Sequence, residues 1–286
     1  MTLKATNNVS KTNSYLILLV LISQTILFAQ NTDDKLSTAA VNVEILEKVV
    51  HVPYSSSSRT LRIYLPPSYQ SGNKQYPVIY MLDGQNLFDE QTAYAGELGV
   101  DEALNHFSNE NKREVIVVGI DNHGVFRMQE YNVVDHPEFG KEQGKAFTEL
   151  LVDVIKPLID KRYRTLSNRQ NTAIVGSSMG GLMSFYALMT YPEVFSMAGV
   201  YSPAFWVSDD IYELYRKNPL LEDCKIHMLV GSKEGGMVPV FQKMQNVLSK
   251  HMSPENFIFD IIEGGTHGEA LWSEQFKSTF EFFYNQ

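Results

Sequence analysis

Short apolar runs, separated by longer amphipathic segments, dominate the pattern of hydrophobic positions along the chain. The first two runs, residues 41–46 and 61–65, alternate apolar and polar side chains, which is typical of strands with one buried face. Six further runs are mainly apolar, which is typical of strands that are buried in a sheet. They cover residues 77–83, 115–120, 172–175, 197–201, 226–231 and 257–262. The pattern therefore predicts eight strands.

Helical periodicity fills most of the intervals between these strands. In residues 142–163, apolar side chains such as Phe147, Leu151 and Ile155 recur on one helical face. Further helices are predicted at residues 100–107, 181–189, 239–252 and 269–284. Strands that alternate with helices predict an α/β fold, with one domain over residues 41–286, a mostly parallel eight-stranded sheet and helices on both of its faces. Binding sites in such sheets lie at the carboxyl ends of the strands.

The first 40 residues do not fit this pattern. Two lysines precede an apolar run at residues 15–22, and the small residue Ala29 ends the segment. This arrangement is typical of a secretory signal peptide over residues 1–29, followed by a polar, disordered segment over residues 30–40. An N-terminal membrane anchor is the alternative, which the shortness of the apolar run disfavours. We therefore expect an exported protein, periplasmic or secreted, without stable membrane association after cleavage.

Composition limits the partners and cofactors. The 286 residues carry a formal net charge of −9, which becomes −11 when residues 1–29, with two lysines and no acidic residue, are removed. An acidic chain is unsuited to nucleic acid and to anionic membrane surfaces. Cys224 is the only cysteine, so an intrachain disulfide is impossible. No group of histidines, cysteines and carboxylates has zinc-ligand spacing, so we expect neither a metal nor a cofactor.

The segment Gly176–Gly180 fits the pattern G-x-S-x-G of a nucleophile elbow, in which a serine sits on a sharp turn between a strand and a helix. A predicted strand precedes this segment and a predicted helix follows it, which is the context that the motif requires. Ser178 is the central residue and the predicted nucleophile. Ser177 is a poorer alternative, because Val175 would then stand where the motif has glycine. A chance turn of small residues is the other alternative.

A carboxylate and a histidine follow in the order that a Ser-acid-His triad has in α/β-hydrolases. Glu234 lies in a glycine-rich loop just after the seventh predicted strand, and His267 lies just after the eighth. A serine hydroxyl is a weak nucleophile until a base takes its proton, and imidazole can accept that proton and return it. A carboxylate orients the imidazole. We therefore predict His267 as the base and Glu234 as the acid.

Other residues could take these two roles. Asp209 and Asp210 are alternative acids in the loop after the sixth predicted strand, Asp260 lies within a strand, and a Ser–His dyad without an acid is also possible. Four other histidines lie in or beside strands or on helices, where a structural role is more consistent with their position. Two more lie in the polar segment 121–139 and could line the pocket. The first four are His227, His51, His106 and His251, and the two in the polar segment are His123 and His136.

Hydrolysis of an ester passes through an oxyanion, which backbone N–H groups must stabilise. The residue after the nucleophile, Met179, is predicted to supply one donor, and the loop after the third strand the other. In that loop Gly84 lets the backbone turn toward the site, and the N–H of Gln85 is the candidate donor. A glycine turn with solvated amides is the alternative.

Six segments of the chain stand in the order found in one enzyme family. They are Leu82–Asp89, Val118–Asn122, Arg127–Tyr131, Gly176–Gly181, Ser202–Trp206 and Gly264–His267. On these segments, over about residues 45–284, the chain resembles the esterase D-like hydrolases. These include enterochelin esterase-like siderophore hydrolases, feruloyl and acetyl xylan esterases, and S-formylglutathione hydrolases. The resemblance implies Ser178 as nucleophile and His267 as base, and it leaves the acid open because members differ in it.

The same resemblance implies a set of substrate-binding residues. One segment resembles the family's Arg-x-x-Glu-Tyr stretch, whose charges either bind substrate or pin the loop near the pocket. Another offers aromatic pocket wall, with core packing as the alternative. The predicted substrate-binding residues are Gly84, Arg127, Tyr131, Phe205 and Trp206.

The sequence therefore predicts an exported serine esterase that forms an acyl-enzyme on Ser178 and acts on a small-molecule or glycan ester. The candidate substrates are a siderophore trilactone, an acylated sugar and a feruloylated glycan. An acyltransferase that uses the same acyl-enzyme is one alternative. A non-catalytic binding protein with this fold is the other, and the intact Ser178 and His267 argue against it.

Overall fold

The last six strands follow the predicted apolar runs closely in the computed structural model, which describes residues 36–110 and 113–284. The first two strands are longer than predicted. The predicted signal peptide lies outside the described residues. The strands are β1 (Val43–Val52), β2 (Ser57–Tyr64), β3 (Val78–Leu82), β4 (Ile116–Ile120), β5 (Thr172–Ser177), β6 (Met197–Tyr201), β7 (Lys225–Gly231) and β8 (Phe257–Ile262).

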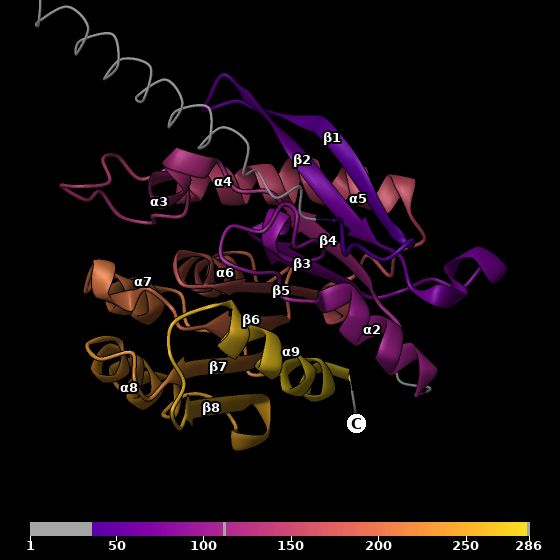
Figure 1. The fold of residues 1–286 in the computed structure, drawn as a ribbon. Coiled ribbons are helices and arrows are strands. Elements are labelled where there is room, and N and C mark those ends of the chain that lie inside the picture. The colour runs from indigo at the N-terminus through magenta and orange to yellow at the C-terminus, as the bar shows by residue number, and fades with distance from the viewer. Residues whose placement is uncertain (1–35, 111–112, 285–286) are drawn as a thin grey trace, which may run out of the picture. The chain divides into compact units, whose positions relative to one another are not determined.

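All eight strands form one sheet in the order β1-β2-β4-β3-β5-β6-β7-β8 (Figure 1). β1 pairs antiparallel with β2, and β2 pairs antiparallel with β4. All other neighbours in the sheet are parallel. The predicted mostly parallel, eight-stranded sheet is therefore confirmed. The carboxyl ends of six strands, β3 to β8, meet at one edge.

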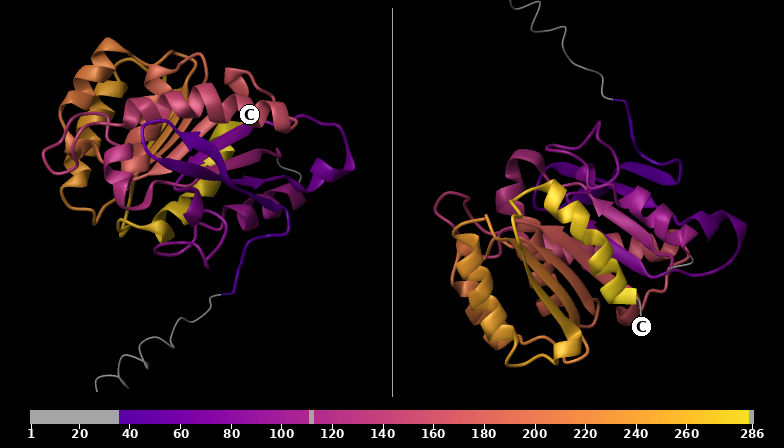
Figure 2. Two further views of the ribbon diagram at one scale, coloured as in Figure 1. Left: turned by 90° about the horizontal axis from the view of Figure 1, so that it is seen from above. Right: turned by 60° about the horizontal axis from the view of Figure 1, so that its bottom comes forward.

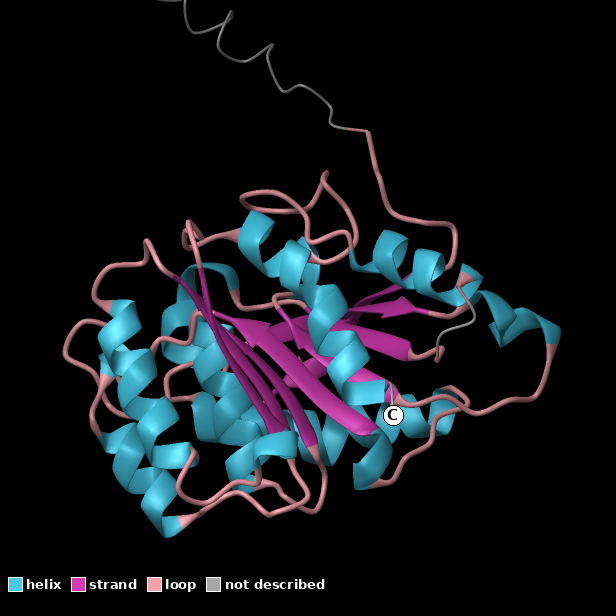
Figure 3. Cartoon of the chain, turned by 90° about the horizontal axis from the view of Figure 1, so that it is seen from below, coloured by secondary structure: helices cyan, strands magenta, loops and turns pink. Residues whose placement is uncertain are grey.

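Helices cover both faces of this sheet, as predicted (Figures 2 and 3). On one face, α2 and α9 contact each other through the rings of Phe107 and Phe280, whose centroids are 5.1 Å apart. On the other face, α4, α5, α6, α7 and α8 enclose the larger apolar core. The helices are α2 (Val100–Asn109), α3 (Arg127–Glu130), α4 (Gly144–Leu150), α5 (Lys156–Arg162), α6 (Met179–Thr190), α7 (Asp210–Lys217), α8 (Met237–Leu248) and α9 (Glu269–Tyr284).

The four-residue helix α3 was not predicted, and two further helical segments differ from the prediction. The single helix expected over residues 142–163 consists of α4 and α5 joined by a π-helical stretch, Leu151–Ile155. The short helix α7, in which half of the residues are charged, was not predicted. It buries Ile211, Tyr212 and Tyr215 on one face, which is enough to dock it on the core.

The start of the folded unit also differs from the prediction. Residues 37–40 belong to the segment predicted to be disordered, but side chains of the domain hold them in place. The hydroxyl of Ser37 and the N–H of Thr38 donate to Asp89, and the N–H of Ala40 donates to Asp101. The compact unit therefore begins at Ser37 rather than at residue 41.

Candidate active site

A cavity of about 650 Å³ lies at the carboxyl edge of the sheet, where binding sites of such folds occur. Its walls come from the loops after β3, β4 and β8, from the end of β5 and from the start of α9. The lining residues include both Ser178 and His267. The structure therefore brings the predicted nucleophile and the predicted base to the same cavity.

Ser178 stands on a strained turn between β5 and α6. Its backbone angles are φ 59° and ψ −120°, in a region that residues other than glycine rarely adopt. A Cβ atom on Gly176 would lie 2.5 Å from the carbonyl oxygen of Gly180, so the turn excludes any larger residue at that position. The N–H of Ser178 donates to the carbonyl of Tyr201 at 2.8 Å. This is the geometry that the G-x-S-x-G pattern requires.

Glu234 and His267 are in direct contact. His267 Nδ1 lies 2.7 Å from Glu234 Oε2, and the Glu234 side chain is fully buried while His267 is 38% exposed. The structure shows no hydrogen bond between Ser178 and His267 among the residues it describes. Such bonds are often long before a substrate binds.

Three donors hold the Glu234 carboxylate. Besides His267, the Gly231 N–H and the Ser202 hydroxyl each donate to Glu234 Oε1 at 2.7 Å. Burial alone would raise the pKa of Glu234, but the hydrogen bonds from His267, Ser202 and Gly231 lower it below its ordinary value. Glu234 is therefore held as a carboxylate facing His267. Asp209, an alternative candidate for the acid, instead forms an exposed ion pair with Lys243.

Sequence reasoning missed the link from Ser202 to Trp272. The Trp272 Nε1–H donates to the Ser202 hydroxyl at 2.9 Å, so Ser202 joins the tryptophan to Glu234. The Trp272 ring also meets His267 edge to face, with ring centroids 5.0 Å apart. Trp272 therefore contacts His267 directly and is linked to Glu234 through Ser202. A tryptophan in the first turns of the helix directly after His267 was the available signal.

The two predicted oxyanion donors belong to the turn that carries Ser178 and to a loop that lines the cavity. Met179 is the first residue of α6, and Gln85 lines the cavity from the loop after β3. Asp83, with φ 58°, turns this loop, and the Gln85 side chain accepts from the Asn122 N–H at 3.1 Å. Within residues 36–110 and 113–284, neither the Met179 nor the Gln85 N–H has a hydrogen-bond acceptor. Both groups are therefore available as donors.

Arg127 lines the cavity but is bound to Asp83. Its Nε and Nη2 atoms donate to the two Asp83 oxygens at 2.6 and 2.7 Å, and Nη2 also reaches the carbonyl of Ser177 at 3.3 Å. Burial would lower the pKa of Arg127, but the Asp83 carboxylate raises it well above its ordinary value. The Asn122 amide donates to the same carboxylate. Arg127 thus ties the oxyanion loop to the strand that carries Ser178.

Four other predicted substrate-binding residues do not line the cavity. Tyr131 is fully buried, and its hydroxyl accepts from the Asp83 N–H. Phe205 is 1% exposed and packs in the core. Trp206 is half exposed, and its ring contacts Phe139 outside the cavity. A Cβ on Gly84 would lie 2.7 Å from the backbone of β4, so this glycine allows close packing. These four residues therefore lie outside the described lining of this cavity.

The cavity is lined instead by residues that the sequence did not single out. Tyr94 and Val125 extend from two different loops, and Glu269 stands at the start of α9. No periodic pattern marks loop residues of this kind. Their proximity depends on how the loops after neighbouring strands fold over the sheet edge.

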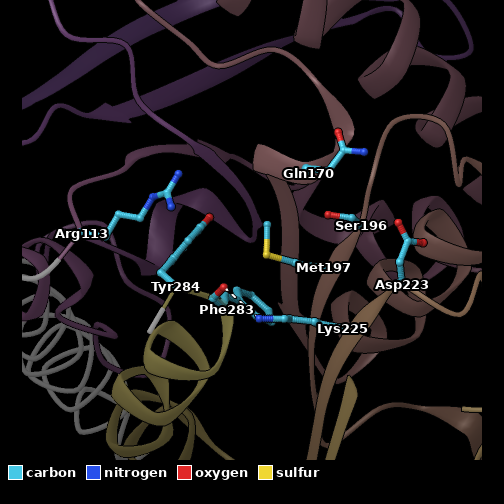
Figure 4. Close-up of a pocket in the computed structure, with 8 residues that line it drawn as sticks. All are labelled: Arg113, Gln170, Ser196, Met197, Asp223, Lys225, Phe283 and Tyr284. Carbon is cyan, nitrogen blue, oxygen red and sulfur yellow. Dashed lines mark hydrogen bonds between the residues drawn. The ribbon is translucent and has the colours of Figure 1, made fainter. Parts of the chain in front are cut away.

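A second cavity, of about 420 Å³, lies near the amino ends of β6 and β7 (Figure 4). Figure 4 shows Arg113 and Tyr284 facing Ser196 and Lys225 across it. The Lys225 ammonium group donates to backbone carbonyls at the end of α9. No histidine is among the described residues that line this cavity. The described lining therefore lacks the histidine that a Ser–His site requires.

A search of the described residues finds no cluster of three or more histidines, cysteines and carboxylates that could hold a metal ion. Among the helices of the same residues, none combines the length and apolar character that crossing a membrane requires.

Known proteins share this fold and sequence pattern. The "Uncharacterized protein YbbA" of Bacillus subtilis is 23% identical over 249 residues, which are 82% of this chain and 95% of the relative. The BES protein from Bacillus cereus has a TM-score of 0.69 at 21% identity and covers 90% of this chain and 100% of its own. The siderophore hydrolase EstB from Aspergillus nidulans also has a TM-score of 0.69, at 18% identity, and covers 86% of this chain and 96% of its own. At such identities, the structural likeness establishes the fold.

The sequence profile of one enzyme family matches most of the domain. This family is described as "Putative esterase", and the match runs over residues 54–283, from β2 to the end of α9. The match contains the elbow, the Glu234–His267 pair and the oxyanion loop, and it confirms the resemblance recognised from the sequence motifs. The chain therefore belongs to this esterase family.

Proposed function

We propose that the chain is an exported serine esterase that hydrolyses a carboxylic ester through an acyl-enzyme on Ser178. The observation that carries the proposal is that Ser178, on a strained turn, and His267, which is hydrogen-bonded to the buried Glu234, line one cavity. A binding protein would need neither the strained turn nor a buried carboxylate aimed at a histidine.

The first half of the reaction follows from these positions. His267 Nδ1 faces Glu234, so its other ring nitrogen, Nε2, is left to take the Ser178 proton. Ser178 Oγ then attacks the ester carbonyl carbon. The negative charge that develops on the carbonyl oxygen is stabilised by the N–H groups of Met179 and Gln85. Each such donor is worth about 10²–10³-fold in rate.

The second half restores the enzyme. His267 gives its proton to the alcohol oxygen as the carbonyl–oxygen bond breaks, which leaves the acyl group on Ser178. A water molecule then loses a proton to His267 and attacks the acyl carbon. The tetrahedral intermediate collapses, the acid leaves and Ser178 recovers its proton. The Glu234 carboxylate stabilises the imidazolium that forms in both halves.

Export is part of the proposal and is supported by the sequence pattern of residues 1–29. The expected mature chain begins after Ala29 or Gln30. N-terminal sequencing of the protein recovered from outside the cytoplasm tests this. A chain that keeps its first 29 residues in that fraction would contradict it.

The catalytic part is tested by labelling and hydrolysis together. A fluorophosphonate probe should label Ser178, as mapped by peptide mass spectrometry, and the purified protein should hydrolyse p-nitrophenyl acetate. Ser178→Ala should abolish both signals. The matched control is Ser177→Ala, which changes the adjacent serine and should keep both. Labelling and turnover that survive in Ser178→Ala would overturn the proposed function.

A further inference from the structure

Negative charge exceeds positive charge around the candidate active site. The charged residues that line the cavity, besides His267, are Asp83, Arg127 and Glu269. Arg127 is engaged by both oxygens of Asp83, so its charge is already balanced by a carboxylate. The buried Glu234 carboxylate adds a further negative charge behind His267.

Glu269 carries the negative charge that is least compensated. It forms no ion pair with any residue that the structure describes. It acts electrostatically on the guanidinium group of Arg127, but that group already binds Asp83. No lysine is found among the described residues that line the cavity.

The other arginines close to the oxyanion loop are paired as well. Arg62 donates to Asp121 at 2.8 Å, and the buried Arg59 contacts the buried Glu130. Neither arginine lines the cavity. A negatively charged substrate would therefore meet no cation that is free of a carboxylate partner among the described lining residues.

Apolar surface is available where cations are missing. Tyr94 and Val125 are each 93% exposed, which is unusual for large apolar side chains, and both line the cavity from different loops. Trp272 and Ala95 extend this apolar wall. A substrate can therefore be held by burying an apolar group against these side chains.

We propose that this site takes an uncharged ester that carries an apolar group, and that Glu269 disfavours esters with a negative charge. The inference rests on the proposed esterase function and names its substrate class. Repulsion within a partly enclosed cavity is screened less than it is at an open surface. Specificity of this kind arises from an unfavourable contact with the wrong substrate.

Glu269 has a second explanation that requires no substrate. It lies in the first turn of α9, where a negative charge stabilises the helix N-terminus. That role predicts a change in stability after substitution, and it predicts no change in the preference between charged and uncharged esters. The ratio of activities toward two matched esters separates the two explanations.

The test uses acetyl esters that differ only in a remote group. 4-Acetoxybenzamide is uncharged and 4-acetoxybenzoate is anionic, and chromatography measures the released phenol. Each kcat/KM is divided by the rate constant of alkaline hydrolysis of the same ester, which corrects for the leaving group. We expect the uncharged ester to be preferred at least about tenfold. The preference should shrink when NaCl is raised from about 50 to about 500 mM.

Two variants locate the effect. Glu269→Gln should reduce the preference at least about threefold. Glu274→Gln removes the same charge from an exposed position on the same helix and should leave the preference unchanged. A ratio within about twofold of one in the unsubstituted protein, or a preference for the anion, overturns the inference while the esterase function stands. An equal effect of both variants also overturns it.

Failure of the proposed function gives a different result. In that case neither ester is hydrolysed and the fluorophosphonate probe leaves Ser178 unlabelled, which would remove the substrate class together with the function. If Glu269→Gln does not fold, the ratio and its salt dependence in the unsubstituted protein still decide the inference.

Discussion

The pair of Glu234 and His267 at the carboxyl edge of the sheet can be compared with a second carboxylate–histidine pair inside the fold. In the second pair, His227 Nε2 on β7 lies 3.2 Å from Asp260 Oδ2 on β8, and His227 Nδ1 lies 2.7 Å from the Thr279 hydroxyl on α9. The residue types of a catalytic triad, a carboxylate, a histidine and a hydroxyl, are therefore assembled here as well.

The buried partner is the carboxylate in the edge pair, Glu234–His267, and the histidine in the interior pair, His227–Asp260. In the edge pair the carboxylate is fully buried and His267 is 38% exposed. In the interior pair His227 is fully buried and the Asp260 side chain is 43% exposed. A substrate can therefore reach the imidazole of the edge pair, whereas β7 and α9 enclose that of the interior pair.

The hydroxyl groups differ in the same sense. Ser178 stands on a strained turn beside a cavity of about 650 Å³. Thr279 is buried on a regular helix and also accepts from the Tyr201 hydroxyl. Three residue types in contact therefore do not make an esterase site. Access, a strained nucleophile and nearby N–H donors are needed in addition.

The largest expected effect comes from the two histidines. His267→Gln should lower kcat/KM for p-nitrophenyl acetate at least about 10³-fold, because Ser178 loses its base. His227→Gln is the matched control and should keep kcat/KM within a few-fold. Steady-state kinetics with active-site titration measures both. If His227→Gln lost activity while the concentration of folded protein stayed the same, His227 would also take part in the reaction, contrary to this prediction.

The two carboxylates should differ next most strongly. Glu234→Gln should lower kcat about 10²–10³-fold, because the imidazolium loses its negative partner and the buried donors lose their acceptor. Asp260→Asn changes the half-exposed carboxylate of the interior pair and should alter kcat about twofold at most. Equal kcat values for Glu234→Gln and the unsubstituted protein would show a Ser–His dyad.

The hydroxyl groups of Ser202 and Thr279, each hydrogen-bonded to one of the two pairs, should also differ in their effect on activity. Ser202→Ala removes one donor to Glu234, and we expect kcat to fall about tenfold with little change in KM. With one donor fewer, the Glu234 carboxylate accepts more strongly from His267, which should move the acid limb of the kcat/KM profile to higher pH. Thr279→Ala should leave this limb in place and reduce the free energy of unfolding by about 1–2 kcal/mol.

Ser202→Ala thus acts as a positioning variant with its own signature. Trp272→Phe removes the donor to Ser202 and should shift the acid limb in the same direction by a smaller amount. An unshifted limb in both variants, with unchanged kcat, would show that the hydrogen bond between Ser202 and Glu234 has no part in the reaction.

The sequence predicted the edge pair for a physical reason. Glu234 and His267 follow the last two predicted strands, and in a parallel sheet the carboxyl ends of neighbouring strands lie side by side. β7 and β8 are indeed adjacent, so the two loops meet. The sharp turn at Ser178 was predictable because the motif has glycine at positions 176 and 180, and only glycine fits at position 176. The strands themselves follow from their apolar runs.

The substrate-facing residues could not be predicted in the same way. Tyr131, Phe205 and Tyr94 are all aromatic residues in or near loops, yet the first two are buried and Tyr94 is 93% exposed beside the cavity. Local pattern gives the residue type, but only the packing of loops from different strands decides which way a side chain points. The Trp272–Ser202 contact joins residues 70 positions apart for the same reason.

The smallest expected effect is on the pH dependence of the free energy of unfolding, and it concerns only the His227–Asp260 pair. Burial lowers the pKa of His227 below its ordinary value of 6.5, although Asp260 opposes this. The unfolded chain therefore binds the proton more readily than the folded protein. The free energy of unfolding should fall as the pH drops below about 6.5, and above that pH the contribution of His227 is complete.

His227→Gln should remove this part of the slope, as measured by urea unfolding between about pH 5 and 8. Other titratable groups also affect the pH dependence of the free energy of unfolding, among them Glu234 and Asp101. Glu234 has a lowered pKa and contributes only below about pH 4.5, outside the measured range. Burial raises the pKa of Asp101 to about 7, which gives a slope of opposite sign, but Asp101 is present in both proteins and cancels in their difference. Equal slopes for both proteins would mean that His227 takes up a proton as readily in the folded protein as in the unfolded chain, and the burial contrast between the two pairs would then have no electrostatic consequence.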